Sequence, residues 1–525
     1  MKKTIKILSI FVLLSSTLIA SQHKKILKED AQKAMKQATI AMMEKVSRDG
    51  GFVWGYLPDF SRTWGELEAY PTSVWVQSPG TPAVGNILLD AYHATKDEFY
   101  YSMAKKVANI LIFGQLECGG WNYFFDLGGE SSIQRWYKTI GKNAWGCSEF
   151  HKYYGNATFD DKTTTDAANF ILRIYLEKYD PKFKVSLDKA INFILQSQYT
   201  IGGWPQRYPL IYNNDNKSDY TSHITLNDAV LDENIGFLLR CYHLLSDKRA
   251  YNAIINAMNC VKNLQQNYPT AGWADQYSLD LKPASAREFE PAAISTSTTA
   301  SCINNLMYYY RMTGDTTYLS GIPAALDFIE SVVINDTGKS NQTNSDKQLC
   351  PRFFIPGTTT PLYIHRKGNH VNNGSYFFDQ NPENTIGHYS SFSFINIEQI
   401  RNEYKSLKST PVSTIISNSI LLNPGKVVIP EFYSGELTKT DEKSVISIIN
   451  SLNSDNLWIS PLTYITNPYV GEGKTDDPAS ITYKETLYGK YNTALYKPEQ
   501  DIYGISTSKY INNMFCLIRF ICSDK

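Results

Sequence analysis

The chain has 525 residues, with 51 basic and 51 acidic side chains and an aromatic content of 13%. A sizeable core can therefore form, and the balanced net charge argues against nucleic acid as a partner. At the N-terminus, Lys2, Lys3 and Lys6 precede an apolar run over 7–20 that ends in the small residues Ala20 and Ser21. This pattern predicts a secretory signal peptide over 1–21, and its removal would leave three more acidic than basic residues. We therefore expect an exported protein, periplasmic or secreted.

A transmembrane anchor is the alternative for this run, but the run is short for a bilayer and no later stretch approaches eighteen apolar residues. No cysteine follows it, so a lipoprotein anchor is not indicated. Eight cysteines occur along the chain, without the spacing of a metal motif. Export permits disulfides, yet several of the cysteines lie in helix-like apolar patterns. We expect mostly buried thiols, with Cys118 and Cys147 as the first pair to test.

A glycine–aromatic motif recurs along the chain. It occurs at Gly50-Gly-Phe52, Gly119-Gly-Trp121, Gly202-Gly-Trp204 and Ala271-Gly-Trp273. Each of the last three follows two helical patterns joined by a polar turn, over 89–115, 172–198 and 239–265, and a fourth helical pair covers 303–333. Repeated helix pairs stack into a solenoid or close into a ring. We predict a mainly α fold, an (α/α) toroid of helical hairpins whose insertions build a groove at one end, with a solenoid as the alternative.

The rest of the chain changes character after the last helical pair. Short aromatic runs over 335–390 predict a β-rich insertion lying over the groove, and a helix is expected over 397–406. Residues 407–425 are rich in Ser, Thr, Asn and Pro, which is typical of a linker. We therefore predict a toroid over 22–406, this linker, and a structural C-terminal extension over 426–525 that contains helices near 441–452 and 509–521.

Acids and arginines gather in the segments that follow the hairpins. The informative strings are Thr158-Phe-Asp160-Asp161, the segment over 202–209, Ile224-Thr-Leu-Asn-Asp228, the segment over 271–277, and Ala284-Ser-Ala-Arg287-Glu-Phe-Glu290-Pro291. In this order they resemble the pectate lyases of polysaccharide lyase family 10, over roughly residues 45–400. The resemblance implies an enzyme that cleaves α-1,4-linked polygalacturonate by β-elimination. We expect a monomer that acts on pectate chains or oligogalacturonides.

The resemblance also assigns roles to single residues. Arg287 falls on the family's general base, and Asp228 and Asp160 fall on acids that bind Ca2+, a cation that takes hard oxygen ligands. Asp160 would also touch the substrate. Arg352 and Arg366 fall on two substrate-binding arginines, each able to hold a uronate carboxylate with two parallel hydrogen bonds.

Each assignment has a structural alternative. Asp228 also suits a helix start, and the neighbouring Asp161 is an alternative to Asp160 as the inward-facing acid. Arg287 could simply pair with Glu288 or Glu290, and an arginine side chain normally keeps its charge because its pKa lies above about 12. The arginines near 352 and 366 could belong to an exposed hairpin. For the string over 202–209 we expect a packing role, with glycines in close contacts and a buried tryptophan.

Three other functions compete with this interpretation. A lyase of another polyuronate, such as alginate, would use the same calcium and arginines. A toroidal glycoside hydrolase would use two carboxylates, which Asp160 and Asp228 could supply, but it gives no role to the three arginines. A noncatalytic pectin-binding protein would be expected to lack the base, whereas Arg287 is present.

Overall fold

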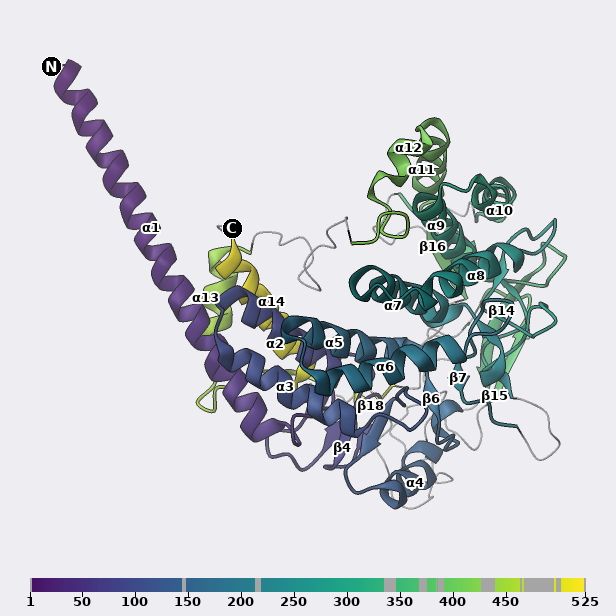
Figure 1. The fold of residues 1–525 in the computed structure, drawn as a ribbon, viewed down its shortest axis with the longest axis horizontal. Coiled ribbons are helices and arrows are strands. Elements are labelled where there is room, and N and C mark those ends of the chain that lie inside the picture. The colour runs from purple at the N-terminus through teal and green to yellow at the C-terminus, as the bar shows by residue number, and fades with distance from the viewer. Residues whose placement is uncertain are drawn as a thin grey trace.

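The computed structural model describes residues 2–143, 148–212, 219–334, 346–367, 375–383, 385, 391–425, 440–462, 465–466, 495–496 and 502–523. Helical hairpins follow one another along an arc (Figure 1). They are α2 (Thr81–Thr95) with α3 (Glu98–Phe113), α5 (Thr163–Lys178) with α6 (Pro181–Gln196), α7 (Val230–Leu245) with α8 (Arg249–Asn263), and α9 (Thr296–Thr313) with α10 (Ile322–Ser331). The predicted mainly α fold, an (α/α) toroid of helical hairpins, is confirmed.

Polar contacts join the inner helices of successive hairpins. The buried Arg173 of α5 forms an ion pair with Asp90 of α2. The Asn305 side chain of α9 donates to Asp232 Oδ1 of α7 at 2.8 Å. Because a buried polar group is costly without a partner, these contacts fix which helix faces lie against each other.

The glycine–aromatic motif ends three of these hairpins, those of α3, α6 and α8, in the same way. Trp204 is fully buried, and its indole N–H donates to the Ile194 carbonyl of α6 at 2.8 Å. Gly202 has φ +103°, and a Cβ there would lie 2.1 Å from the Asn256 carbonyl oxygen of α8. Glycine is therefore required for the motif to approach the next outer helix. The predicted packing role of Gly202 and Trp204 is confirmed.

The two ends of the described chain form the first layer of the arc. Helix α14 (Thr507–Cys522) packs against α2 and against α1 (Lys2–Ala41). Residues 2–21 of the predicted signal peptide form the first half of α1. Strand β20 (Tyr503–Ser506) pairs with β1 (Gly55–Tyr56). Helix α14 and α13 (Glu442–Asn450) confirm the two helices expected in the C-terminal region. No helix in the described residues is long and apolar enough to cross a membrane.

Short strands occupy the segments between hairpins and position the site. The pairs are β6 (Ala157–Thr158) with β7 (Arg207–Tyr208), and β8 (Ile224–Thr225) with β10 (Gln276–Tyr277). A five-stranded sheet has the order β15 (Ser375–Asp379), β14 (Pro361–Lys367), β13 (Phe353–Phe354), β11 (Ile294–Ser295) and β9 (Trp273–Ala274). Strand β12 (Gln348–Pro351) pairs with β16 (Phe392–Ile395). The β-rich character expected here is therefore confirmed.

The segment that follows these strands is largely helical. Helix α11 (Ile397–Ser409) follows β16 and confirms the helix expected over 397–406. The predicted linker over 407–425 contains the short helix α12 (Val412–Ile415).

The cysteines of the described core are thiols. Cys241, Cys260, Cys302 and Cys350 are buried and free, as their apolar surroundings in the sequence predicted. Cys147 lies outside the described residues, so the structure does not test whether it pairs with Cys118.

Candidate active site

Two matching turns carry the predicted metal acids. The turns Asp160–Lys162 and Asn227–Ala229 each follow a two-residue strand and precede an inner helix, α5 or α7. Asp161 has φ 47° and ψ 33°, and Asp228 has φ 51° and ψ 25°, so both residues are left-handed. Such non-glycine conformations cost roughly 1–3 kcal/mol and cluster at functional sites. The two left-handed aspartates therefore indicate a functional site at this end of the hairpins.

Three acids from these turns lie close together. Burial, then Asp160, then Glu66 raise the pKa of Asp161 to about 8. Burial, followed by Asp160, holds the pKa of Asp228 well above its usual range. Asp161 Oδ2 also accepts a hydrogen bond from Gln77 Nε2 at 2.6 Å. The sequence left open whether Asp160 or Asp161 faces the site. The structure brings both acids to it.

Arg287 lies between these acids. Its Nη2 is 2.8 Å from Asp160 Oδ2 and 3.2 Å from Glu149 Oε1, and its Nη1 is 3.5 Å from Asp228 Oδ2. Nη1 also lies 3.3 Å from Glu290 Oε1. Only 8% of the Arg287 surface is exposed. The predicted base thus contacts both predicted metal acids as well as its sequence neighbour Glu290.

Glu149 is a site residue that the sequence did not indicate. It is buried, and besides Arg287 it binds the Tyr123 hydroxyl and the Gln206 amide. Burial raises the pKa of Glu149 to about 7, against the opposing effect of Arg287. Glu149 lies in a short 3-10 turn, Ser148–Phe150, outside the repeated motifs, so no pattern distinguished it from a surface acid.

Other missed residues did have a signal in the repeat. Tyr123, Gln206 and Asp275 each stand two positions after the tryptophan of a glycine–aromatic motif, and all three are buried polar residues. The Tyr123 hydroxyl donates to Asp160 at 2.5 Å, Gln206 donates to Glu149, and Asp275 Oδ2 lies 3.4 Å from an Arg352 nitrogen. A polar residue at this position therefore reaches the site in three successive repeats.

The two predicted clamp arginines lie on the β-rich side of the site. Arg352 lies between β12 and β13, and it lines a cavity of about 210 Å³ together with Asp228 and Asn227. Arg366 lies in β14 opposite Tyr376 of β15. The side chain of Arg366 is outside the described part, so its role stays a prediction.

The site holds an excess of negative charge. Among the described residues, Glu66, Glu149, Asp160, Asp161, Asp228 and Glu290 lie around Arg207 and Arg287, with Arg352 in the adjoining cavity. The buried Asp160 Oδ1 has no hydrogen-bond partner among the described residues. Within this same part of the chain, no three His, Cys, Asp or Glu side chains converge as a metal-binding group. The acids instead turn toward Arg287, and Asp160, Asp161 and Asp228 are the residues that could hold a hard divalent cation.

A comparison with family models indicates the kind of enzyme. Residues 132–380 match the model described as pectic acid lyase. This segment is somewhat less than half of the chain, and over it the chain is similar to the pectic acid lyase family. It is therefore an enzyme, a polysaccharide lyase. Asp160, Asp228, Arg287 and Arg352 all lie inside the matched residues of this pectic acid lyase.

Solved structures similar to this pectic acid lyase include a family 10 polysaccharide lyase from Cellvibrio cellulosa, with 19% identity and a TM-score of 0.41 over 62% of this chain and 97% of that chain. A mutant of the Cellvibrio lyase in complex with trigalacturonic acid matches with 19% identity and a TM-score of 0.41, over 62% of this chain and 98% of the other. The α-1,6-mannanase from Salegentibacter has 12% identity and a TM-score of 0.35, over 94% and 98%. A search of curated proteins finds no match. The assignment rests on the family model.

Proposed function

We propose that this pectic acid lyase cleaves α-1,4-linked polygalacturonate by Ca2+-assisted β-elimination, with Arg287 as the base. The observation that carries the proposal is the contact of one buried arginine with both predicted metal acids, at 2.8 Å to Asp160 and 3.5 Å to Asp228. Pectate chains and oligogalacturonides are the proposed substrates, and the protein is proposed to act as an exported monomer.

The reaction needs charge stabilisation because the C5 proton of a galacturonate is a weak acid. Its removal produces an enediolate beside the carboxylate, and this charge must be met by fixed cations. Bound calcium would supply a Lewis acid for the substrate carboxylate and the developing charge. Asp160, Asp161 and Asp228 would hold it, which suits the unpartnered Asp160 oxygen and the acid excess of the site.

Arg287 can act as a base only if its charge is made less favourable. The carboxylates that now surround it stabilise the guanidinium. Arg287 would lose two of these partners when Asp160 and Asp228 turn to a metal, and burial then favours its neutral form. Glu149 and Glu290 would keep the guanidinium in place, while Arg352 would hold a uronate carboxylate of the substrate.

One experiment separates the competing functions. The protein is incubated with polygalacturonate and with alginate, with calcium or with a chelator, and both reducing ends and near-ultraviolet absorbance are recorded. We expect absorbance to rise only when polygalacturonate and calcium are both present, since elimination leaves a conjugated double bond. New reducing ends without absorbance would indicate a hydrolase. Activity on alginate alone would indicate another polyuronate.

A further inference from the structure

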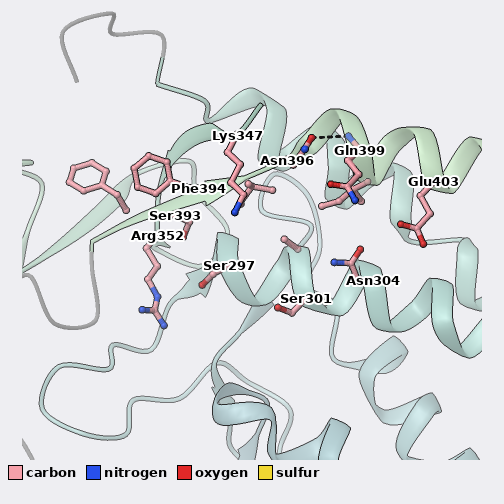
Figure 2. A pocket seen from close by; sticks show the side chains of 14 residues that line it. Ser297, Ser301, Asn304, Lys347, Arg352, Ser393, Phe394, Asn396, Gln399 and Glu403 are labelled. Carbon is pink, nitrogen blue, oxygen red and sulfur yellow. Dashed lines mark hydrogen bonds between the residues drawn. The ribbon is translucent and has the colours of Figure 1, made fainter. Parts of the chain in front are cut away.

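A second cavity opens beside Arg352. It has a volume of about 540 Å³ and lies between α9 on one side and β16 and α11 on the other (Figure 2). It shares Ser297, Ser301 and Arg352 with the smaller cavity that reaches Asp228. The two cavities therefore adjoin each other at these three residues.

We propose that this outer cavity binds a further uronate residue of the polysaccharide chain and that Lys347 binds its carboxylate. The inference rests on the proposed function. Figure 2 shows Lys347 extending toward α9, which presents Ser297, Ser301 and Asn304, while Arg352 lies at the end of the cavity near Ser297. A chain held at Arg352 would thus meet a second cation as it leaves the site.

The charges of the outer cavity favour an anion. Lys347 is exposed, and within the described residues it forms no ion pair. Glu403 is the one acid among the lining residues, and it is 2.5 Å from Arg311 Nη2, which offsets its charge. Arg352 is partly balanced by Asp275 at 3.4 Å. The ammonium of Lys347 therefore remains to attract a carboxylate.

The neutral lining suits a sugar ring. Phe394 of β16 is 47% exposed, so its ring offers an apolar face to the C–H groups of a pyranose. Ser301, Asn304 and Gln399 supply hydroxyl and amide groups for sugar hydroxyls. The volume lies within the range of roughly 300–1,000 Å³ that is usual for small-ligand sites.

This wall of the cavity is specific to the C-terminal side of the chain. Phe394, Gln399 and Glu403 follow residue 380, where the family match ends. The subsite is thus built partly from residues outside the family segment, and it would extend the preference of the enzyme toward longer chains.

Substrate length provides the first test. For Lys347→Ala with saturating calcium, we expect the KM for hexagalacturonate to rise about fivefold, as the loss of a partly exposed ion pair implies. The KM for the shortest oligogalacturonate that the wild type cleaves should stay unchanged, and so should kcat. Lys405→Ala removes an exposed charge of α11 that does not line the cavity, and it should change neither value. Equal KM changes for both lengths, or none, would overturn the subsite.

Direct binding keeps the subsite separate from the catalytic proposal. Calorimetry with hexagalacturonate in the presence of a chelator should show at least tenfold weaker binding for Lys347→Glu than for the wild type, and weaker binding for Phe394→Ala. Unchanged binding of both variants would overturn the proposal even if the enzyme cleaves polygalacturonate. If the protein cleaves no galacturonate of any length but still binds hexagalacturonate in a way that depends on Lys347, the proposed reaction is wrong and the subsite is retained.

Discussion

Asp161 and Asp228 occupy the same place in successive hairpins, as the second residue of a left-handed turn that leads into an inner helix. By the same register Asp160 corresponds to Asn227, whose amide donates to Asp228 at 2.8 Å. The two turns contact each other, and Arg287 binds an acid from each. The internal repeat thus places acids from two hairpins around one guanidinium.

Asp228→Asn should lower calcium affinity at least tenfold without destabilising the metal-free protein. Asparagine tolerates the left-handed conformation, and the raised pKa of Asp228 means that its charge is unfavourable in the folded state. Calorimetric calcium titration and melting in chelator measure the two effects. Asp280→Asn, at an exposed acid paired with Lys282, is the control. A much lower melting temperature with unchanged calcium binding would make Asp228 structural.

Glu149→Gln should lower kcat ten- to a hundredfold while KM changes less than about threefold. The amide keeps the shape of the side chain but removes the charge beside Arg287 Nη2, and a hydrogen bond to a charged group contributes roughly 1.5–3 kcal/mol. Steady-state kinetics on polygalacturonate give both constants. Glu288→Gln, at the exposed residue next to Arg287, serves as the control. A change confined to KM would assign Glu149 to substrate binding instead of positioning Arg287.

The metal-free protein should become less stable as the pH rises from 5 to 9. Asp161 has a pKa of about 8 and Glu149 of about 7, whereas carboxylic acids in an unfolded chain titrate near 4. Between these values the folded state binds more protons than the unfolded state, so stability falls with rising pH. Melting in chelator across this range should show the fall. Asp161→Asn should flatten it, and a melting temperature that rises with pH would contradict the account.

Arg352→Lys should raise the KM for polygalacturonate, because one ammonium replaces a fork that can hold both carboxylate oxygens. The expected loss is about 1–3 kcal/mol in kcat/KM, the range for charged hydrogen bonds. Lysine keeps the positive charge beside Asp275, so folding should be retained. Unchanged kinetics would place this side of the sheet outside the groove.

The hairpins were predictable because the repeat is local. Gly202 and Trp204 make contacts that depend on glycine and on a large ring, so the motif shows in the sequence wherever the packing recurs. The place of α14 beside α2 was not predictable in this way. Its contacts join residues more than four hundred positions apart, and no local pattern records such a pairing.

The site residues also differ in whether a local sequence pattern marks them. Asp160, Asp228 and Arg287 stand in strings that resemble a family, and the structure brings them together. Glu149 stands in no string and reaches Arg287 only through the fold. The raised pKa of Asp161 likewise depends on Glu66, which lies almost a hundred residues earlier in the chain and outside the family segment.

If Arg287 abstracts the proton, its protonation should control how the rate of elimination depends on pH. The initial rate is measured from pH 6 to 10 under saturating calcium for the wild type and for Arg287→Ala, with oligogalacturonate binding and melting recorded for both proteins. An arginine base has a very small neutral fraction below its pKa, so the rate should rise about tenfold per pH unit on the alkaline side. Arg287→Ala should bind oligogalacturonate but show no elimination. A flat profile, or an Arg287→Ala protein with near-normal turnover, would show that Arg287 is not the base.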